Sequence, residues 1–141
     1  MKKNGAGFLI GKIFPDGNIR FLGLVAPIET RVKKKGIFDI PKGKIKPGES
    51  SLDCAIRECF EESGILISRK DIIGKPYSDK NLIIYPAISN SDVEILPNPE
   101  TGIVEHEGAM WLSRDEIENL CLDYLSRIIK KLTVSFTTRV R

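Results

Sequence analysis

The stretch that decides the fold is GKIKPGESSLDCAIRECFEESGI, residues 43–65, a glycine-bounded loop followed by a helical pattern. Ser50 is placed to cap the start of the helix, with Asp53 at the capping-box spacing, because a side-chain oxygen there satisfies free backbone N–H groups. Gly64 is placed to end it, since glycine readily adopts the left-handed conformation of a C-cap. The sequence therefore predicts a helix over residues 51–63.

One face of this helix carries three carboxylates. At about 100° per residue, Glu58, Glu61 and Glu62 fall within roughly 100° of one another. Like charges three or four residues apart destabilise a helix by up to about 0.5 kcal/mol per pair, and Arg57 alone cannot neutralise three of them. Oxygen ligands suit a hard divalent cation, so the pattern predicts a Mg²⁺ or Mn²⁺ site; the alternative is a solvated acidic face. The opposite face is expected to be buried and consists of Leu52, Ile56, Cys59 and Phe60.

The loop before the helix suits a phosphate group. It is basic, is bounded by Gly43 and Gly48, and ends at a helix N-terminus, where backbone N–H groups face an anion. A Walker-type P-loop is excluded, because the pattern G-x-x-x-x-G-K-S/T requires lysine where this chain has Glu49. An ATPase of that kind is therefore not expected.

Residues 43–65 resemble the Nudix box, G-x5-E-x7-R-E-U-x-E-E-x-G-U, in which U is a bulky apolar residue. The matching positions are Gly43, Glu49, Arg57, Glu58, Glu61, Glu62, Gly64 and Ile65. Cys59 departs from the pattern, since it is smaller than the usual aliphatic residue, and we expect a small buried thiol there. The resemblance implies a metal-dependent hydrolase that cleaves a diphosphate linked to another moiety.

The same resemblance assigns roles within the box. The predicted ligands of Mg²⁺ or Mn²⁺ are the carbonyl of Gly43 and the carboxylates of Glu58, Glu61 and Glu62. Arg57 and Glu49 would orient these groups, and Glu58 is the first candidate for the catalytic base.

Members of this family often add an acidic residue from a later loop. Glu107 is our candidate and Glu105 its rival, whereas the alternative for both is an exposed loop carboxylate. His106 is the only histidine, and between two glutamates in a loop it is expected to be solvated rather than catalytic.

The remaining elements predict an α+β fold. A hairpin is expected from residues 7–14 and 18–25, because Pro15, Asp16 and Gly17 between them suit a turn. Further strands are predicted over residues 37–40, 72–77, 82–88, 93–96 and 109–112, with a basic loop over 29–36.

A second helix is predicted after Ser113, which forms a capping box with Glu116. Its apolar face comprises Ile117, Leu120, Cys121, Tyr124, Leu125, Ile128, Ile129 and Leu132. The expected architecture is a Nudix-like α/β/α sandwich, with a mixed β-sheet flanked by the catalytic helix and this C-terminal helix, in one domain of residues 1–141.

Composition limits the class of protein. With 141 residues, 41% hydrophobic and 29% charged, the chain suits one globular domain. No apolar run approaches the roughly 20 residues of a membrane-spanning helix, so no membrane partner is expected and a cytoplasmic location is favoured. The three cysteines lack metal-site or redox spacing and are expected to be reduced core residues. The net charge of +3 is too small to indicate nucleic acid by itself, and the sequence carries no signal for an oligomeric state.

Residues outside the box bear on the substrate. The lead-in from Phe38 to Gly43 resembles the diadenosine-polyphosphate and diphosphoinositol branches of the family. Tyr77 and Tyr85 are candidates for stacking on a base, unless they belong to the core. The expected substrate is a small nucleotide, first of all a dinucleoside polyphosphate such as diadenosine tetraphosphate. Binding of its phosphates is expected from Lys42 and Lys44, in a lysine-rich entrance that also holds Lys33, Lys34, Lys35 and Lys46, unless these lysines are simply solvated.

Three alternatives remain open. RNA 5′-end pyrophosphohydrolysis or decapping would use the same basic entrance to hold RNA phosphates. A nucleoside triphosphate pyrophosphatase would need only the box. A noncatalytic Nudix-like binding module is disfavoured, because all the box glutamates are intact.

Overall fold

The computed structural model describes residues 3–139 and contains one mixed β-sheet, as predicted. The strands are β1 (Gly5–Ile13), β2 (Ile19–Val25), β3 (Phe38–Asp39), β4 (Lys42–Lys44), β5 (Tyr77–Asp79), β6 (Leu82–Ile88) and β7 (Gly108–Leu112). Their order is β3-β2-β1-β6-β5, with β4 beside β1 and β7 beside β2. Strands β1 and β6 run parallel, whereas the other pairs are antiparallel.

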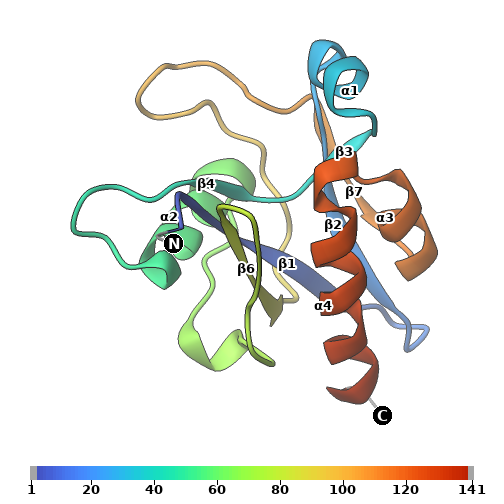
Figure 1. Cartoon of the computed structure of the whole chain (residues 1–141). Helices are drawn as coiled ribbons and strands as arrows, with labels where there is room; N and C mark the ends of the chain where they lie inside the picture. The colour runs from blue at the N-terminus through green and yellow to red at the C-terminus, as the bar shows by residue number, and fades with distance from the viewer. Residues whose placement is uncertain (1–2, 140–141) are drawn as a thin grey trace.

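Helices cover both faces of the sheet. They are α1 (Ile28–Lys34), α2 (Ser51–Ser63), α3 (Arg114–Leu120) and α4 (Ser126–Arg139), with short 3-10 turns η1 (Arg69–Asp71) and η2 (Asp123–Leu125). Figure 1 shows α2 on one side of the sheet and α4 on the other, which confirms the expected layers. Within residues 3–139, no helix has the length and apolar character needed to cross a membrane.

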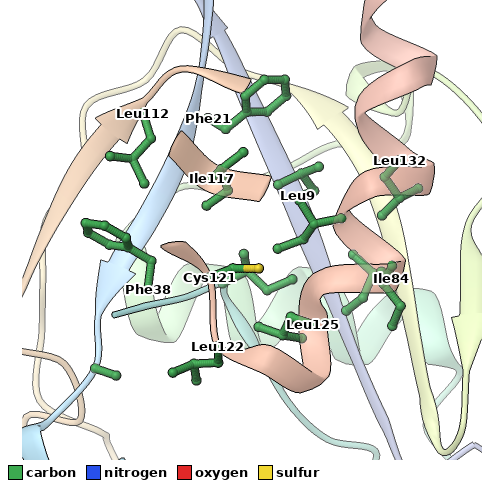
Figure 2. Close-up of a cluster of buried hydrophobic side chains, with 14 of the residues drawn as sticks. Leu9, Phe21, Phe38, Ile84, Leu112, Ile117, Cys121, Leu122, Leu125 and Leu132 are labelled. Atoms are coloured by element: carbon green, nitrogen blue, oxygen red, sulfur yellow. The ribbon is translucent and has the colours of Figure 1, made fainter. Parts of the chain in front are cut away.

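The central strand β1 supplies both hydrophobic cores. Leu9 packs toward α3 and α4, while Phe8 and Ile10 pack toward α2, because alternate side chains of a strand point to opposite faces. Figure 2 shows the core on the α4 side, where Leu9 and Ile84 of the sheet lie near Leu132 and Leu125. Cys54, Cys59 and Cys121 are all buried free thiols, as expected.

The helix that decides the fold begins and ends where the sequence predicts. The Asp53 N–H donates to the Ser50 hydroxyl at 3.1 Å, and Gly64 ends the helix at a φ of 73°. Cys59 is buried against the sheet, as the small thiol at that position suggested. Phe60 differs from expectation, since it is 48% exposed and not part of the buried face.

The segment after β2 is a helix, not the basic loop predicted for residues 29–36. Helix α1 has acidic Glu29 in its first turn and basic residues in its last, both favourable to the helix dipole. It ends at Lys35, which takes a left-handed φ of 54°. The sequence pattern missed this helix because it has no buried residue and hence no apolar stripe.

Two predicted strands differ from the structure. Over residues 72–76 the chain forms one isolated bridge, between Ile72 and Ala87, and the strand β5 begins only at Tyr77. Residues 93–96 form no strand, although Val93 and Ile95 pack on the α2-side core as alternating apolar residues do. Their backbone is held instead by the Glu94 N–H, which donates to the carbonyl of Ser63 at 2.8 Å.

The predicted C-terminal helix is broken at Cys121, whose ψ of 161° is extended. The Ile37 N–H donates to the Leu120 carbonyl, and the Leu122 N–H donates to the Phe38 carbonyl, each at 2.9 Å. These bonds align the chain beside β3, so the helix cannot continue through residue 121. The capping box of Ser113 and Glu116 is confirmed at the start of α3.

Candidate active site

The box begins where β4 meets α2. Gly43 pairs with Ala6 of β1, and a β-carbon on Gly43 would overlap the Glu58 carboxylate. The Gly43 carbonyl oxygen lies 3.5 Å from the Cys54 sulfur, which donates to it. Strand and helix therefore touch here, and a side chain at residue 43 would have to displace the Glu58 carboxylate.

Arg57 fastens the loop to the helix. Its Nε lies 2.8 Å from Glu49 Oε2 and its Nη2 lies 2.9 Å from Glu49 Oε1, a two-point ion pair. The Nη2 group also donates to the Lys44 carbonyl at 2.9 Å. Hydrogen bonding to Arg57 lowers the pKa of Glu49 to about 2, and the same bonds raise the pKa of Arg57. This side chain therefore ties together the two ends of the loop.

Arg57 also contacts two of the three helix glutamates. Its Nη1 lies 2.8 Å from Glu58 Oε1 and 3.4 Å from Glu61 Oε2. Glu58 and Glu61 line a cavity of about 790 Å³ together with the loop that carries Glu49. On the far wall, Lys46 forms a 3.0 Å ion pair with Glu100.

Glu62 faces a second, smaller cavity. This cavity of about 210 Å³ is lined by Glu62, Asp39, Lys42, Glu105 and His106, with Pro27 and Thr30 next to α1. The Lys42 N–H donates to Glu62 Oε1 at 3.3 Å. Burial, followed by the charges of Asp39 and Glu58, raises the pKa of Glu62 to about 9. Burial likewise raises the pKa of Glu58.

These groups fit a hard divalent cation. Within residues 3–139 no three acidic, cysteine or histidine side chains form a ready-made metal cluster, since Glu58 and Glu61 face Arg57 while Glu62 faces Lys42. The donor set is nevertheless all oxygen, namely the Gly43 carbonyl and the three helix carboxylates. Burial, with smaller contributions from neighbouring carboxylates, raises the pKa values of Glu58 and Glu62, and a bound cation would favour the ionised forms instead.

The loop before β7 places its three polar residues differently. Glu107 forms a 2.6 Å ion pair with Arg31 of α1, and its N–H donates to the Val25 carbonyl. Glu105 is exposed and lines the smaller cavity. His106 is only 7% exposed, so the expectation of a solvated histidine is wrong. Sequence reasoning missed it because a single histidine between two glutamates carries no apolar periodicity.

Lys42 lies in a buried ion pair at the edge of this cavity. Its Nζ is 3.2 Å from Asp39 Oδ1. Burial alone would lower the pKa of Lys42, but the charge and hydrogen bonds of Asp39 and Tyr124 together outweigh it and raise the pKa. The Lys42 ammonium also lies 5.4 Å from the centre of the Tyr124 ring, and that of Lys34 lies 5.8 Å from it.

A third cavity, of about 400 Å³, opens beside Gly43. It is lined by Lys42, Lys44, Lys80, Leu82 and Tyr124, among others. Lys42 and Lys44, which are predicted to bind phosphates, thus line the same cavity. Tyr124 was expected only in the helical core, but the chain break at Cys121 and the turn η2 bring it to the cavity.

The two tyrosines that the sequence singled out lie elsewhere. The Tyr85 hydroxyl is 2.7 Å from the Ser51 hydroxyl, and its ring packs 5.9 Å from that of Phe8 on the α2 side. Tyr77 is half-buried against the opposite core. Neither lines the three cavities described above, so their stacking role stays a prediction.

Comparison with known proteins gives matching results from sequence and fold. The NUDIX domain family model matches residues 24–132. The asymmetrical bis(5'-nucleosyl)-tetraphosphatase of Sus scrofa is 34% identical over 86 residues, which are 54% of this chain and 55% of that protein. The match therefore spans about half the length of this relative.

Two solved structures resemble the whole chain. An Ap4A hydrolase from C. elegans, in a binary complex, has a TM-score of 0.66 at 21% identity and covers 95% of this chain and 97% of its own. The MutT protein of Methanosarcina mazei has a TM-score of 0.62 at 23% identity, and the match covers 96% of this chain and 98% of that protein. At these identities the likeness is one of fold.

Proposed function

Since this chain belongs to the Nudix hydrolase family, we propose that it hydrolyses a phosphoanhydride bond of a dinucleoside polyphosphate, with diadenosine tetraphosphate as the first candidate. The observation that carries the reaction is the intact box, in which Arg57 joins Glu49 of the loop to Glu58 of the helix. The observation that carries the substrate is the lysine-rich cavity with Tyr124, directly beside Gly43. The names of the tetraphosphatase and Ap4A hydrolase relatives support the same choice.

The ligands of a Mg²⁺ or Mn²⁺ ion would be the Gly43 carbonyl with Glu58, Glu61 and Glu62. When bound, such a cation screens the negative charge of the diphosphate and lowers the pKa of water near the scissile bond. Glu61 lines the larger cavity and Glu62 the smaller one. In β4, Gly43 lies between Lys42, which lines the smaller cavity, and Lys44, which lines the larger one, which is why we place the reacting diphosphate against it.

Glu58 is our candidate for the base that takes a proton from the attacking water. It is half-buried, and burial raises its pKa above the ordinary value, which makes the carboxylate a stronger base. The 2.8 Å bond to Arg57 Nη1 fixes one of its oxygens. Arg57, itself held by Glu49, therefore positions the base.

The geometry favours Glu105 over Glu107 as the loop carboxylate. Glu107 is occupied by Arg31 at 2.6 Å, outside the smaller cavity, whereas Glu105 lines that cavity together with Glu62. In our proposal the role that the sequence gave to Glu107 passes to Glu105, and Glu107 anchors the loop.

The nucleoside farthest from the reacting phosphorus is placed in the cavity with Tyr124. Its base would stack on the Tyr124 ring, where Lys34 and Lys42 now lie within 6 Å of the ring centre. The intervening phosphates would run past Lys42 and Lys44 to Gly43. Several phosphates and a base fit this arrangement better than a sugar diphosphate of low charge.

The three buried free thiols agree with a cytoplasmic location, which we propose on that ground. Their burial in the two cores leaves no pair placed as a disulfide among the described residues.

A substrate panel tests the proposed function. The full chain with Mg²⁺ or Mn²⁺ would be given diadenosine tetraphosphate, ATP, ADP-ribose, capped RNA and 5′-triphosphorylated RNA, and the products identified by chromatography. We expect the highest kcat/KM for diadenosine tetraphosphate. Preference for RNA, a nucleoside triphosphate or ADP-ribose would reject the substrate but keep the hydrolase, whereas binding without turnover of any compound would indicate a noncatalytic module.

A further inference from the structure

The loop before β7 is held at two adjacent residues. His106 Nε2 lies 3.3 Å from Asp39 Oδ2, and the two side chains are only 8% and 13% exposed. The next residue, Glu107, is bound by Arg31 at 2.6 Å and by its own N–H to the Val25 carbonyl. Residues 99–105 before them are exposed. Burial in this loop therefore begins at His106, the residue that follows Glu105.

Asp39 is the shared acceptor at the base of this arrangement. Its Oδ1 accepts the Ile40 N–H at 2.8 Å and lies 3.2 Å from Lys42 Nζ, while Oδ2 faces His106. Burial alone would raise the pKa of Asp39, but the hydrogen bond with His106 and the charge of Lys42 together lower it. Asp39 thus stays ionised and joins β3 to a loop 67 positions later.

This contact lies at the wall that also carries Glu62. Asp39, His106, Lys42, Glu62 and Glu105 line one cavity of about 210 Å³. A buried histidine in a hydrogen bond has one fixed ring orientation, so the backbone on either side of it is fixed as well. Glu105 gains a defined place opposite Glu62 through its neighbour, although Glu105 itself has an exposed side chain.

We propose that His106 is a positioning residue, which Asp39 holds so that Glu105 is presented to the cation and substrate beside Glu62. This inference rests on the proposed function, because it assigns Glu105 to that reaction. It differs from a purely structural role for His106, in which the side chain fills a buried position and affects stability alone.

The test compares His106→Gln with His106→Leu in the full chain. Glutamine keeps an N–H donor for Asp39, whereas leucine keeps only the volume. We expect His106→Leu to lower both Mn²⁺ affinity, measured by isothermal titration calorimetry, and kcat by about tenfold or more, with KM changed less than about twofold. His106→Gln should recover most of both losses. Equal losses in the two variants, or none in either, would contradict the proposal.

A double-mutant cycle separates positioning from stability. If His106 acts through Glu105, then His106→Leu should cause no further loss of Mn²⁺ affinity or kcat in a Glu105→Gln background. Losses that add in the double variant would refute the link. Circular dichroism checks folding, and His106→Asn, whose shorter amide does not reach Asp39, replaces His106→Leu if the latter fails to fold.

The calorimetric measurement of Mn²⁺ affinity still tests the role of His106 if no compound in the panel is hydrolysed. Lack of turnover by the unsubstituted chain would reject the proposed function. The Mn²⁺ affinities of the single and double variants would still show whether the effects of the two substitutions are coupled. Coupling would mean that His106 positions Glu105, and independent effects would mean that it does not.

Discussion

Gly43 and Glu58 lie so close together that a β-carbon on residue 43 would occupy the place of the Glu58 carboxylate. Gly43 has no left-handed backbone conformation, so this glycine is required for space. Gly64, at the other end of the box, has a φ of 73° and is required for its conformation. Gly43 is therefore favoured by the space available and Gly64 by its backbone conformation.

Gly43→Ala should displace Glu58 and lower kcat by more than about tenfold, because the added methyl group and the carboxylate cannot both fit. The clashing atoms are the end of a flexible side chain, so the stability should change little while the carboxylate moves. Steady-state kinetics and urea unfolding measure the two effects. Gly74→Ala is the matched control, since its β-carbon would meet its nearest neighbours at 3.6 Å or more without a positive φ. Unchanged kcat in Gly43→Ala would contradict the steric account.

Arg57→Lys should lower kcat while KM changes little. Lysine keeps the charge, but it lacks the planar group that binds both Glu49 oxygens, Glu58 and the Lys44 carbonyl at once. The base would then be poorly oriented while the substrate cavity is intact. Initial rates over a range of substrate concentrations separate the two constants, and a rise in KM alone would mean that Arg57 grips substrate.

Glu49 should make stability depend on pH in the acid range. Its pKa in the folded protein is about 2, below the ordinary value of 4.5, so it favours folding when ionised. The contribution is complete above about pH 4.5 and is lost as the pH falls toward 2. The free energy of unfolding of Glu49→Gln should therefore lie below that of the unsubstituted chain at pH 6, and the gap should narrow by pH 3. A gap that is constant over this range would count against the assignment.

Glu62→Gln should remove most turnover yet stabilise the metal-free protein. Burial and neighbouring charges raise the pKa of Glu62 to about 9 from 4.5, so its ionisation opposes folding increasingly as the pH rises between these values. In chelator, the variant should melt at a higher temperature than the unsubstituted chain at pH 8, with a smaller gain at pH 5. Mn²⁺ should stabilise the unsubstituted chain more than the variant.

Glu61→Gln should also lose turnover, with unchanged helix content by circular dichroism. Full activity of the unsubstituted chain in excess chelator would overturn the metal requirement.

Tyr124→Leu should selectively impair dinucleotides. Loss of stacking between a base and an aromatic ring costs about 1–3 kcal/mol, so kcat/KM for diadenosine tetraphosphate should fall at least about fivefold while inorganic polyphosphate is spared. Tyr85→Leu and Tyr77→Leu are the comparisons, because both rings lie away from the cavity beside Gly43. A larger loss of kcat/KM in Tyr85→Leu or Tyr77→Leu would instead indicate that the base stacks on that tyrosine, as the sequence suggested. Added salt should reduce the preference for longer phosphate chains, since it screens Lys42 and Lys44.

The sequence predicts well those parts of the fold that depend on local chemistry. Helix α2 and strand β6 have the expected bounds, because caps and an apolar run specify them over a few residues. The break at Cys121 was not predictable, because the residues on both sides keep helical spacing and most of the apolar ones pack into one core. Pairing with Ile37 and Phe38, more than 80 positions earlier in the chain, interrupts the helix.

In the candidate site, too, local sequence predicts some contacts and long-range pairing of strands determines the others. The contacts among Glu49, Arg57 and Glu58 follow from spacing within 10 residues, since one loop and one helix turn bring them together. The contact between His106 and Asp39 depends on how β7 and β3 flank β2, which no local pattern specifies. Tyr124 reached the cavity for a similar reason, through pairing of the preceding residues with β3.

The parallel pairing of β1 with β6 determines when the acidic helix can become stable during synthesis. Gly5 pairs with Leu82, and the whole box lies in the connection between them. A helix of 13 residues is marginal alone, and α2 packs on β1 and on β6, so its packing surface is complete only when the ribosome has released β6. Such long-range parallel pairing is intrinsically slow, and the apolar run of β1 is exposed meanwhile. The nascent chain is therefore most vulnerable to aggregation between the synthesis of these two strands, when a chaperone would have the most to bind.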